Sequence, residues 1–218
     1  MTFCLNTKII GPTNPENIKN AVILLHGYGG DGQDISLLTL NWQRFLPSTV
    51  FLCPDGHQKC KINPSGYQWF DLSIDDEKYI LDESIKAENI LFKFINEIKS
   101  KFKLSNSKII LGGFSQGCMM SINLGLTTEE KFNSIIGFSG KIINKEDLQK
   151  RKISNTKMFL LHGDSDEVVH PSSLLEANDF LIRNSVEVKI YMLKNCGHHI
   201  PVEASSLALN YIKNNLSQ

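Results

Sequence analysis

Short apolar runs recur along the whole chain, and polar, glycine-rich or helix-like connections separate them. Six of these runs are of strand type, and the first, residues 21–25, is continuous, a pattern typical of a strand that is buried on both faces of a sheet. The six runs cover residues 21–25, 49–53, 109–111, 134–138, 158–161 and 186–193. A seventh run, residues 3–10, precedes a turn-forming Gly-Pro-Thr-Asn-Pro stretch and predicts an edge strand.

Helical spacing occurs between some of these runs. Over residues 82–102 the apolar residues fall near one side of a helix, with charged residues opposite. A shorter pattern formed by Leu38, Trp42 and Phe45 predicts a helix over residues 35–45. Because strands and helices alternate, the sequence predicts an α/β fold with a mostly parallel sheet and helices on both faces. Sites in such folds gather beyond the carboxyl ends of the strands.

Length and charge narrow the class of protein. The 218 residues suit one domain spanning residues 1–218, because α/β folds of this size commonly keep a single core. Basic and acidic residues each number 23, so the formal net charge is zero. Without a basic cluster, neither nucleic acid nor an anionic membrane is an expected partner. No apolar run approaches the ~18 residues of a spanning helix, so stable membrane insertion is not expected.

The cysteines indicate the redox environment. All five are scattered, without a Cys-x-x-Cys pair or histidines at metal-binding spacing. Such an odd set is typical of reduced thiols rather than of disulfides or metal ligands. The amino terminus lacks the pattern of a secretory leader, so the sequence predicts a cytoplasmic protein.

A candidate nucleophile follows the run at residues 109–111. Residues 113–117 match Gly-x-Ser-x-Gly, and an apolar, helix-like segment covers residues 118–126. In this strand-turn-helix element the serine has a strained backbone, and its hydroxyl stands clear of the sheet. Glycine is needed on either side because strand and helix pass too close for a Cβ atom. The pattern alone arises by chance, but its context favours Ser115 as a nucleophile.

A serine hydroxyl is nearly inert at neutral pH, so it needs a general base and an acid that fixes the base's tautomer. Asp164 and Asp166 follow the strand at 158–161, and His198 and His199 follow the strand at 186–193. The order Ser, Asp, His is the one expected of a triad on an α/β-hydrolase sheet.

Each loop offers a choice of residue. Asp166 is the preferred acid, because Asp164 suits a turn residue that caps the loop backbone. His198 is the preferred base, with His199 as its nearest competitor. His170 lies in the acid's own loop, before a proline, and is expected to be a structural surface residue.

Two backbone amides are predicted to bind the oxyanion that serine attack creates. One is the N–H of Gln116, which follows the nucleophile at the start of a helix. The other is the N–H of Tyr28, in the glycine-rich loop after the strand at 21–25. The alternative, a phosphate-binding loop, is weaker because the loop lacks both the Gly-x-Gly-x-x-Gly spacing and a following Lys-Ser/Thr.

Several motifs together resemble one family. They are His-Gly-Tyr-Gly-Gly at 26–30, Trp-Phe-Asp at 69–71, Gly-Gly-Phe-Ser-Gln-Gly at 112–117, Gly-Asp-Ser-Asp at 163–166 and Gly-His at 197–198. The chain is similar over nearly its whole length to the carboxylesterase/lysophospholipase group of α/β-hydrolases, which includes the acyl-protein thioesterases. The resemblance implies a compact fold without a large cap domain. One departure is His170, which stands where relatives usually have a proline.

The same resemblance implies hydrolysis of ester or thioester bonds in small esters, lysophospholipids or acylated proteins, without metal or organic cofactor. It implies Ser115, Asp166 and His198 as the triad, with Tyr28 and Gln116 at the oxyanion. The segment 57–74 then becomes a candidate acyl pocket or lid. Its expected lining residues are apolar, with core packing as the alternative for the two buried-type aromatics: Ile62, Tyr67, Trp69, Phe70 and Leu72.

Two other functions stay open at this point. One is a non-catalytic binding protein on the same fold, which would ordinarily have a broken triad. The other is a peptidase on the same scaffold, although 218 residues leave little room for the large cap that often restricts peptide access. Acyl chain length, the preferred leaving group and the oligomeric state are not predicted.

Overall fold

Seven strands form one central sheet in the computed structural model, which describes residues 3–151 and 154–216. The sheet order is β1-β3-β2-β6-β7-β8-β9. Only β1 runs antiparallel to its neighbour, and the other adjacent pairs are parallel. The predicted mostly parallel sheet is therefore confirmed, and the edge strand predicted over residues 3–10 is present but shorter. The strands are β1 (Thr7–Ile10), β2 (Asn20–Leu25), β3 (Thr49–Pro54), β6 (Ile109–Phe114), β7 (Ser134–Phe138), β8 (Met158–Gly163) and β9 (Val188–Leu193).

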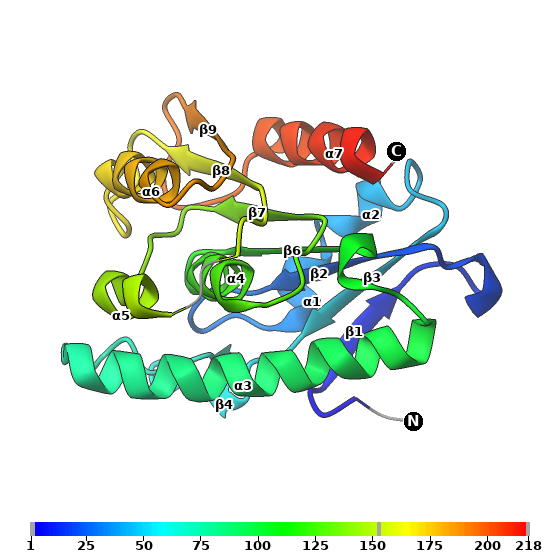
Figure 1. Cartoon of the computed structure of the whole chain (residues 1–218), viewed down its shortest axis with the longest axis horizontal. Coiled ribbons are helices and arrows are strands. Elements are labelled where there is room, and N and C mark those ends of the chain that lie inside the picture. The colour runs from blue at the N-terminus through cyan, green and yellow to red at the C-terminus, as the bar shows by residue number, and fades with distance from the viewer. Residues whose placement is uncertain (1–2, 152–153, 217–218) are drawn as a thin grey trace.

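Helices cover both faces of this sheet (Figure 1). On one face, apolar side chains of the sheet pack against α3 (Glu77–Phe102), α4 (Gln116–Thr127), α5 (Lys145–Lys150) and α6 (Ser172–Arg183). The other face packs against α1 (Gly32–Ser36), α2 (Thr39–Trp42) and α7 (Val202–Leu216). Strand β2 contributes alternate residues to the two cores, so its continuous apolar run reflects burial on both sides.

The predicted helix over residues 35–45 is wrong in its extent. Two short helices, α1 and α2, take its place, and α1 begins earlier, after Asp31 accepts a hydrogen bond from the Asp34 amide. Leu37 and Leu38 keep helical dihedral angles between the two. Their amides bond to carbonyls three residues back rather than four, which divides the pattern.

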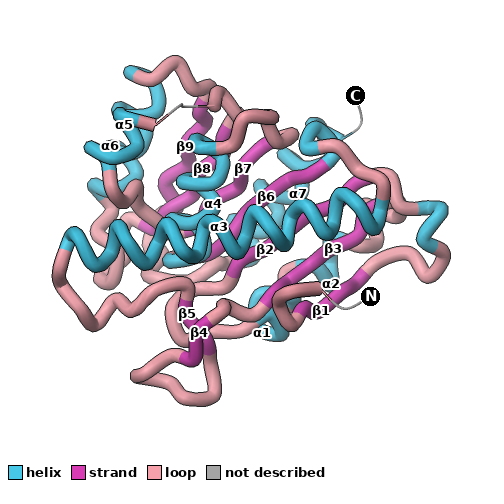
Figure 2. The backbone as a smooth tube through the Cα atoms, turned by 60° about the horizontal axis from the view of Figure 1, so that its bottom comes forward, coloured by secondary structure: helices cyan, strands magenta, loops and turns pink. Residues whose placement is uncertain are grey.

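Helix α3 is longer than predicted and crosses the sheet strands on one face (Figure 2). It begins five residues earlier than predicted, with exposed Glu77 and Lys78, and includes Ile80, which packs against the core; the Asp76 side chain caps the first turn by accepting from the Tyr79 amide. No helix in the described ranges is long and apolar enough to span a bilayer. The segment between β3 and α3 contains a small hairpin, β4 (Gln58–Lys59) and β5 (Tyr67–Gln68).

Candidate active site

Ser115 lies at the sharp turn between β6 and α4. Its backbone angles are φ 51° and ψ −114°, a strained conformation for a residue with a side chain. A Cβ atom on Gly113 would lie 2.5 Å from the carbonyl carbon of Gly117, and one on Gly117 would lie 2.1 Å from the Leu25 carbonyl oxygen. Both motif glycines are therefore required by the close passage of backbone around the serine.

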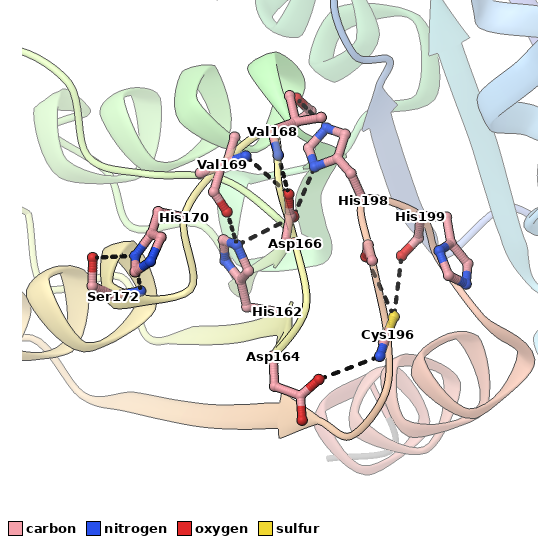
Figure 3. Close-up of polar contacts among 12 residues, drawn as sticks. His162, Asp164, Asp166, Val168, Val169, His170, Ser172, Cys196, His198 and His199 are labelled. Carbon is pink, nitrogen blue, oxygen red and sulfur yellow. Dashed lines mark hydrogen bonds and ion pairs between the residues drawn. The ribbon is translucent and has the colours of Figure 1, made fainter.

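A continuous chain of hydrogen bonds joins Ser115, His198 and Asp166. The His198 Nε2 atom lies 3.0 Å from Ser115 Oγ, and its Nδ1 atom lies 2.7 Å from Asp166 Oδ2 (Figure 3). An ionised carboxylate can only accept, so Nδ1 carries the proton and Nε2 is left to accept from the serine hydroxyl. The three side chains come from separate loops at the carboxyl ends of β6, β8 and β9.

Asp166 is held as a buried carboxylate. The residue is 3% exposed, and its Oδ1 atom accepts from the amides of Val168 and Val169 at 2.9 Å each. Burial alone would raise the pKa of Asp166, but the hydrogen bonds from His198 and the two amides outweigh it, and the pKa is lowered. The acid loop therefore closes on Asp166 although His170 stands before Pro171.

The competing residues lie away from this chain of bonds. Asp164 is exposed and caps its loop, accepting from Ser165 Oγ at 2.8 Å and from the Cys196 amide at 3.4 Å. In Figure 3 the His199 ring points away from Asp166, and His170 bonds to Ser172 at the start of α6. The structure thus brings together the preferred member of each pair.

His162 is a buried neighbour of the acid that the sequence did not single out. It is 1% exposed, and its Nε2 atom donates to the Val169 carbonyl at 2.8 Å while lying 3.3 Å from Asp166 Oδ2. Burial lowers the pKa of His162, which favours the neutral ring. Its four-residue spacing from Asp166, across a strand end, was the one sequence signal available.

The glycine-rich loop after β2 passes directly against the nucleophile. A Cβ atom on Gly27 would lie 3.3 Å from Ser115 Cβ. Within the described residues the amide of Tyr28 makes no hydrogen bond, and Gln116 opens α4, where a first-turn amide has no partner inside its helix. Both predicted amides are thus available beside Ser115.

The hairpin segment holds this loop through backbone contacts. The Gly29 amide donates to the Tyr67 carbonyl at 2.9 Å, and the Tyr67 amide donates to the Gly30 carbonyl at 2.8 Å. Asn63 adds a side-chain donation to the Gly29 carbonyl at 2.7 Å. Gly29 itself has φ 79°, a conformation that favours glycine.

Two buried side chains, His26 and Asp71, hold this loop in place through hydrogen bonds. His26 is 1% exposed, donates from Nδ1 to the Gly27 carbonyl at 2.7 Å and accepts from the Gly56 amide at Nε2 at 2.8 Å. Burial lowers its pKa, so the ring is neutral in this role. The Tyr28 hydroxyl donates at 2.9 Å to Asp71, whose pKa is lowered by the Lys61 ion pair and by bonds from Ser73 and Tyr28.

The predicted acyl-pocket residues require a correction. Trp69 and Phe70 are fully buried in the core, Tyr67 contacts the Tyr28 loop through its backbone, and Ile62 is 70% exposed. None of the four lines either cavity beside Ser115 and His198, whereas Leu72 does. Large aromatic side chains are buried for their area, and here that area faces the core rather than substrate.

The side chain of Gln116 explains why Trp69 and Phe70 lie in the core. It is fully buried, accepts from the Trp69 amide at Oε1 at 3.0 Å and donates from Nε2 to the Phe70 carbonyl at 2.7 Å. Trp69 in turn donates from Nε1 to the His26 carbonyl at 3.0 Å. The sequence pointed to the backbone of Gln116 but missed this second role of its side chain.

Two cavities adjoin the Ser115–His198 pair. The smaller measures about 470 Å³, and Ser115 belongs to its lining together with Leu72, Met119, Lys141, Val168 and Val169. The larger measures about 650 Å³ and is lined by His198 but not by Ser115; its wall includes Leu37, Leu38, Trp42, Phe45 and Leu209. Gly27, Tyr28, Phe114 and His198 border both. Both volumes are within the range of small-molecule sites.

The cysteines and potential metal ligands add no further centre to this site. All five cysteines are free thiols. In residues 3–151 and 154–216, no three His, Cys, Asp or Glu side chains come together in a way that would hold a metal ion.

A mostly parallel seven-stranded sheet with helices on both faces, carrying a serine at a strand-turn-helix elbow, defines an α/β-hydrolase. The sequence profile of the Phospholipase/Carboxylesterase family matches residues 6–216. The chain therefore belongs to that family and is an esterase-type hydrolase, as its motifs predicted.

Named relatives agree with this assignment. The chain is similar to acyl-protein thioesterase 1 of Schizosaccharomyces pombe, with 27% identity over 200 residues that cover 87% of this chain and 86% of the relative. It is also similar to the crystal structure of esterase PE8, with a TM-score of 0.91, 32% identity and coverage of 97% and 99%. A Bacillus cereus carboxylesterase has a TM-score of 0.80, 16% identity and coverage of 97% and 95%, and shows the fold alone.

Proposed function

We propose that this chain hydrolyses carboxylic esters or thioesters through an acyl-enzyme, with Ser115 as nucleophile, His198 as general base and Asp166 as the acid that orients it. The observation that carries the proposal is the position of His198, whose two ring nitrogens reach Ser115 Oγ and Asp166 Oδ2 at 3.0 and 2.7 Å. This geometry supplies the base and the fixed tautomer that a serine needs.

Acylation follows from these contacts. Ser115 Oγ attacks the carbonyl carbon while its proton moves to His198 Nε2, and the carbonyl oxygen becomes an oxyanion. The amides of Tyr28 and Gln116 donate to that oxygen, and such donors are typically worth ~10² to 10³ in turnover each. The intermediate then collapses, the bond to the leaving oxygen or sulfur breaks, and His198 returns the proton to that atom.

Deacylation repeats the sequence with water. His198 takes a proton from the water, which attacks the acyl carbon, and Ser115 leaves with the proton restored. Asp166 stays ionised throughout, because its pKa is lowered, and stabilises the imidazolium that forms twice in each cycle. Oxygen and sulfur leaving groups follow the same path, so small acyl esters, lysophospholipids and acylated proteins are all within its chemistry. The thioesterase names of the relatives support the thioester part.

The test is labelling by a fluorophosphonate together with turnover of an activated short-chain ester. We expect wild-type protein to react in both assays and Ser115→Ala to react in neither while unfolding at the same temperature. Equal labelling of Ser115→Ala would refute the nucleophile. An unreactive wild-type protein would instead favour a binding protein on the same fold, and faster cleavage of a matched peptide than of the ester would favour a peptidase.

A further inference from the structure

The two cavities beside the catalytic pair differ in which of its members they expose. Ser115 lines the smaller cavity, whereas the larger cavity is lined by His198 and not by Ser115. Tyr28 and Phe114 stand on the border between them. A substrate whose carbonyl carbon is at Ser115 Oγ can therefore place its acyl group in one cavity and its leaving group in the other.

The reaction distinguishes the two roles, and this step rests on the proposed function. The acyl carbon becomes bonded to Ser115 Oγ and stays there until water attacks. The leaving oxygen or sulfur must instead accept its proton from His198 Nε2. His198 borders both cavities and Ser115 only the smaller one, so the acyl group fits the smaller cavity and the leaving group can extend into the larger one, where His198 is the catalytic residue present.

The wall of the larger cavity is mostly apolar, with Asp34, Asn41, Ser205 and Ser206 among its polar side chains, and it extends onto the surface. Leu37 is 59% exposed, Phe45 54% and Val202 83%, and all three belong to its lining. Singly exposed apolar residues are ordinary, but a contiguous set around a cavity marks a binding surface. These side chains come from the α1–α2 region and the start of α7, apart from the acid loop.

The charged residues around the larger cavity limit which chemical groups it can bind. Asp34 is exposed at this cavity, and no lysine or arginine is among its lining residues in the described chain; the Lys213 ammonium lies outside the lining, over the ring of Phe45 at 5.3 Å. A carboxylate on the wall disfavours an anionic group such as a glycerophosphate. We infer that the larger cavity binds the leaving group of the substrate, and that this group is a neutral, hydrocarbon-rich alcohol or thiol.

The experiment varies the two halves of the ester separately. The substrates are ethyl acetate as reference, octyl acetate with a long leaving group, and ethyl octanoate with a long acyl group. The variant is Leu37→Ser combined with Val202→Ser, which removes apolar contact from two exposed lining positions. Leu40→Ser is the matched control, because Leu40 is 51% exposed in α2 but does not line the cavity.

We expect the double variant to lower the ratio of kcat/KM for octyl acetate over ethyl acetate by roughly tenfold, the scale of a few lost methylene contacts. The ratio for ethyl octanoate over ethyl acetate should keep its wild-type value, and Leu40→Ser should change neither ratio. A drop in the octanoate ratio alone would assign the larger cavity to the acyl group and overturn the inference. An unchanged octyl ratio would also overturn it.

A fourth substrate tests the charge. The acetate ester of an alcohol as long as octanol but ending in a carboxylate should have a lower kcat/KM than octyl acetate in the wild-type protein. Equal or faster turnover of the charged ester would contradict a neutral leaving group. Ethyl acetate turnover and fluorophosphonate labelling report the proposed function itself, so their loss in wild-type protein is distinguishable from a wrong assignment of the cavity.

Discussion

The side-chain amide of Gln116 binds the backbone of Trp69, with Oε1 accepting from the Trp69 amide at 3.0 Å. Trp69 then donates from its indole to the carbonyl of His26, which opens the loop of Tyr28. We propose the backbone amide of Gln116 as one donor to the oxyanion. Through Trp69, the side chain of Gln116 therefore also fixes the loop that carries the second donor, the Tyr28 amide. Nucleophile helix and oxyanion loop are parts of one hydrogen-bonded unit.

Replacement of Gln116 by alanine keeps its backbone amide and removes only this connection. Gln116→Ala leaves the Trp69 amide and the Phe70 carbonyl buried without partners, and each such group costs about 1–3 kcal/mol of stability. We also expect kcat/KM for an activated ester to fall by up to ~10²-fold, because small displacements of donors are costly. Urea unfolding and ester kinetics measure the two effects.

The control for that variant is Gln43→Ala, which truncates an exposed glutamine near α2. It should change neither quantity beyond experimental scatter. If Gln116→Ala unfolded at the wild-type urea concentration, the connection to Trp69 would not stabilise the fold as its burial indicates.

A second prediction concerns the hydroxyl of Tyr28 and its acceptor Asp71. Tyr28→Phe preserves the backbone amide but removes the 2.9 Å bond that orients the loop. The loss in kcat should stay below the ~10² that follows from removing an oxyanion donor outright. Asp71→Asn should also lower kcat, since Asp71 accepts from the Tyr28 hydroxyl and from Ser73.

The variant Lys61→Gln tests whether the positive charge beside Asp71, rather than the hydrogen bond from the Tyr28 hydroxyl, orients the loop. The Lys61 side chain is 66% exposed but that of Asp71 is 1% exposed, so Lys61→Gln leaves a buried carboxylate without its counter-charge and should lower stability in urea. The bonds from Tyr28 and Ser73 to Asp71 remain, so we expect kcat to stay closer to wild type than in Tyr28→Phe. Wild-type rates in Tyr28→Phe would mean that the glycine-rich loop keeps its shape without Asp71.

The candidate triad was accessible from sequence because parallel topology brings the carboxyl ends of strands to one edge. Once the strands at residues 109–111, 158–161 and 186–193 were recognised, their following loops had to lie close together. Turn chemistry set Asp164 apart from Asp166, and the Gly197-His198 motif of the family set His198 apart from His199; both choices agree with the geometry. Sequence patterns were therefore sufficient to predict which loops lie close together, because the topology of the sheet determines this.

Side-chain direction was the part that sequence did not determine. Trp69 and Phe70 carry the same apolar signal whether they line a cavity or the core, and the deciding contact is the amide of Gln116, 46 or more residues away in sequence. His162 was missed for a similar reason, because it belongs to an apolar strand and its partner Asp166 lies across a strand end. Neither the distant contacts of Gln116 nor the short-range contact of His162 around a strand end leaves a periodic trace in the sequence.

The elbow allows a steric prediction at Gly117. A Cβ atom there would lie 2.1 Å from the Leu25 carbonyl oxygen, a backbone atom that cannot rotate away. Gly117→Ala should cost about 1–3 kcal/mol or more through overpacking and should abolish ester turnover, because Ser115 would be displaced. In Gly30→Ala the nearest atom would be 3.4 Å away, so its unfolding midpoint should remain near wild type. Equal stability of the two variants would contradict the steric argument.

The buried neutral state of His162 predicts a loss of stability on mild acidification. Burial lowers its folded pKa below the ordinary value of 6.5, so the unfolded chain takes up this proton first as pH falls. The contribution of the neutral His162 ring to the free energy of unfolding is therefore complete above pH 6.5 and is lost as the pH falls below it. Asp166 does not interfere in this window, because its pKa is lowered from an ordinary value of 3.8 and its contribution is lost only in stronger acid.

Urea unfolding at about pH 7.5 and about pH 5.5 measures this effect. Wild-type protein should lose stability between the two, and His162→Gln should lose less, since its amide can still donate to the Val169 carbonyl but does not titrate. A remaining loss is expected from His26, whose pKa burial also lowers. His170→Gln, at an exposed histidine, should behave like wild type. If His162→Gln lost as much stability as wild type, protonation of the buried ring would not be the cause.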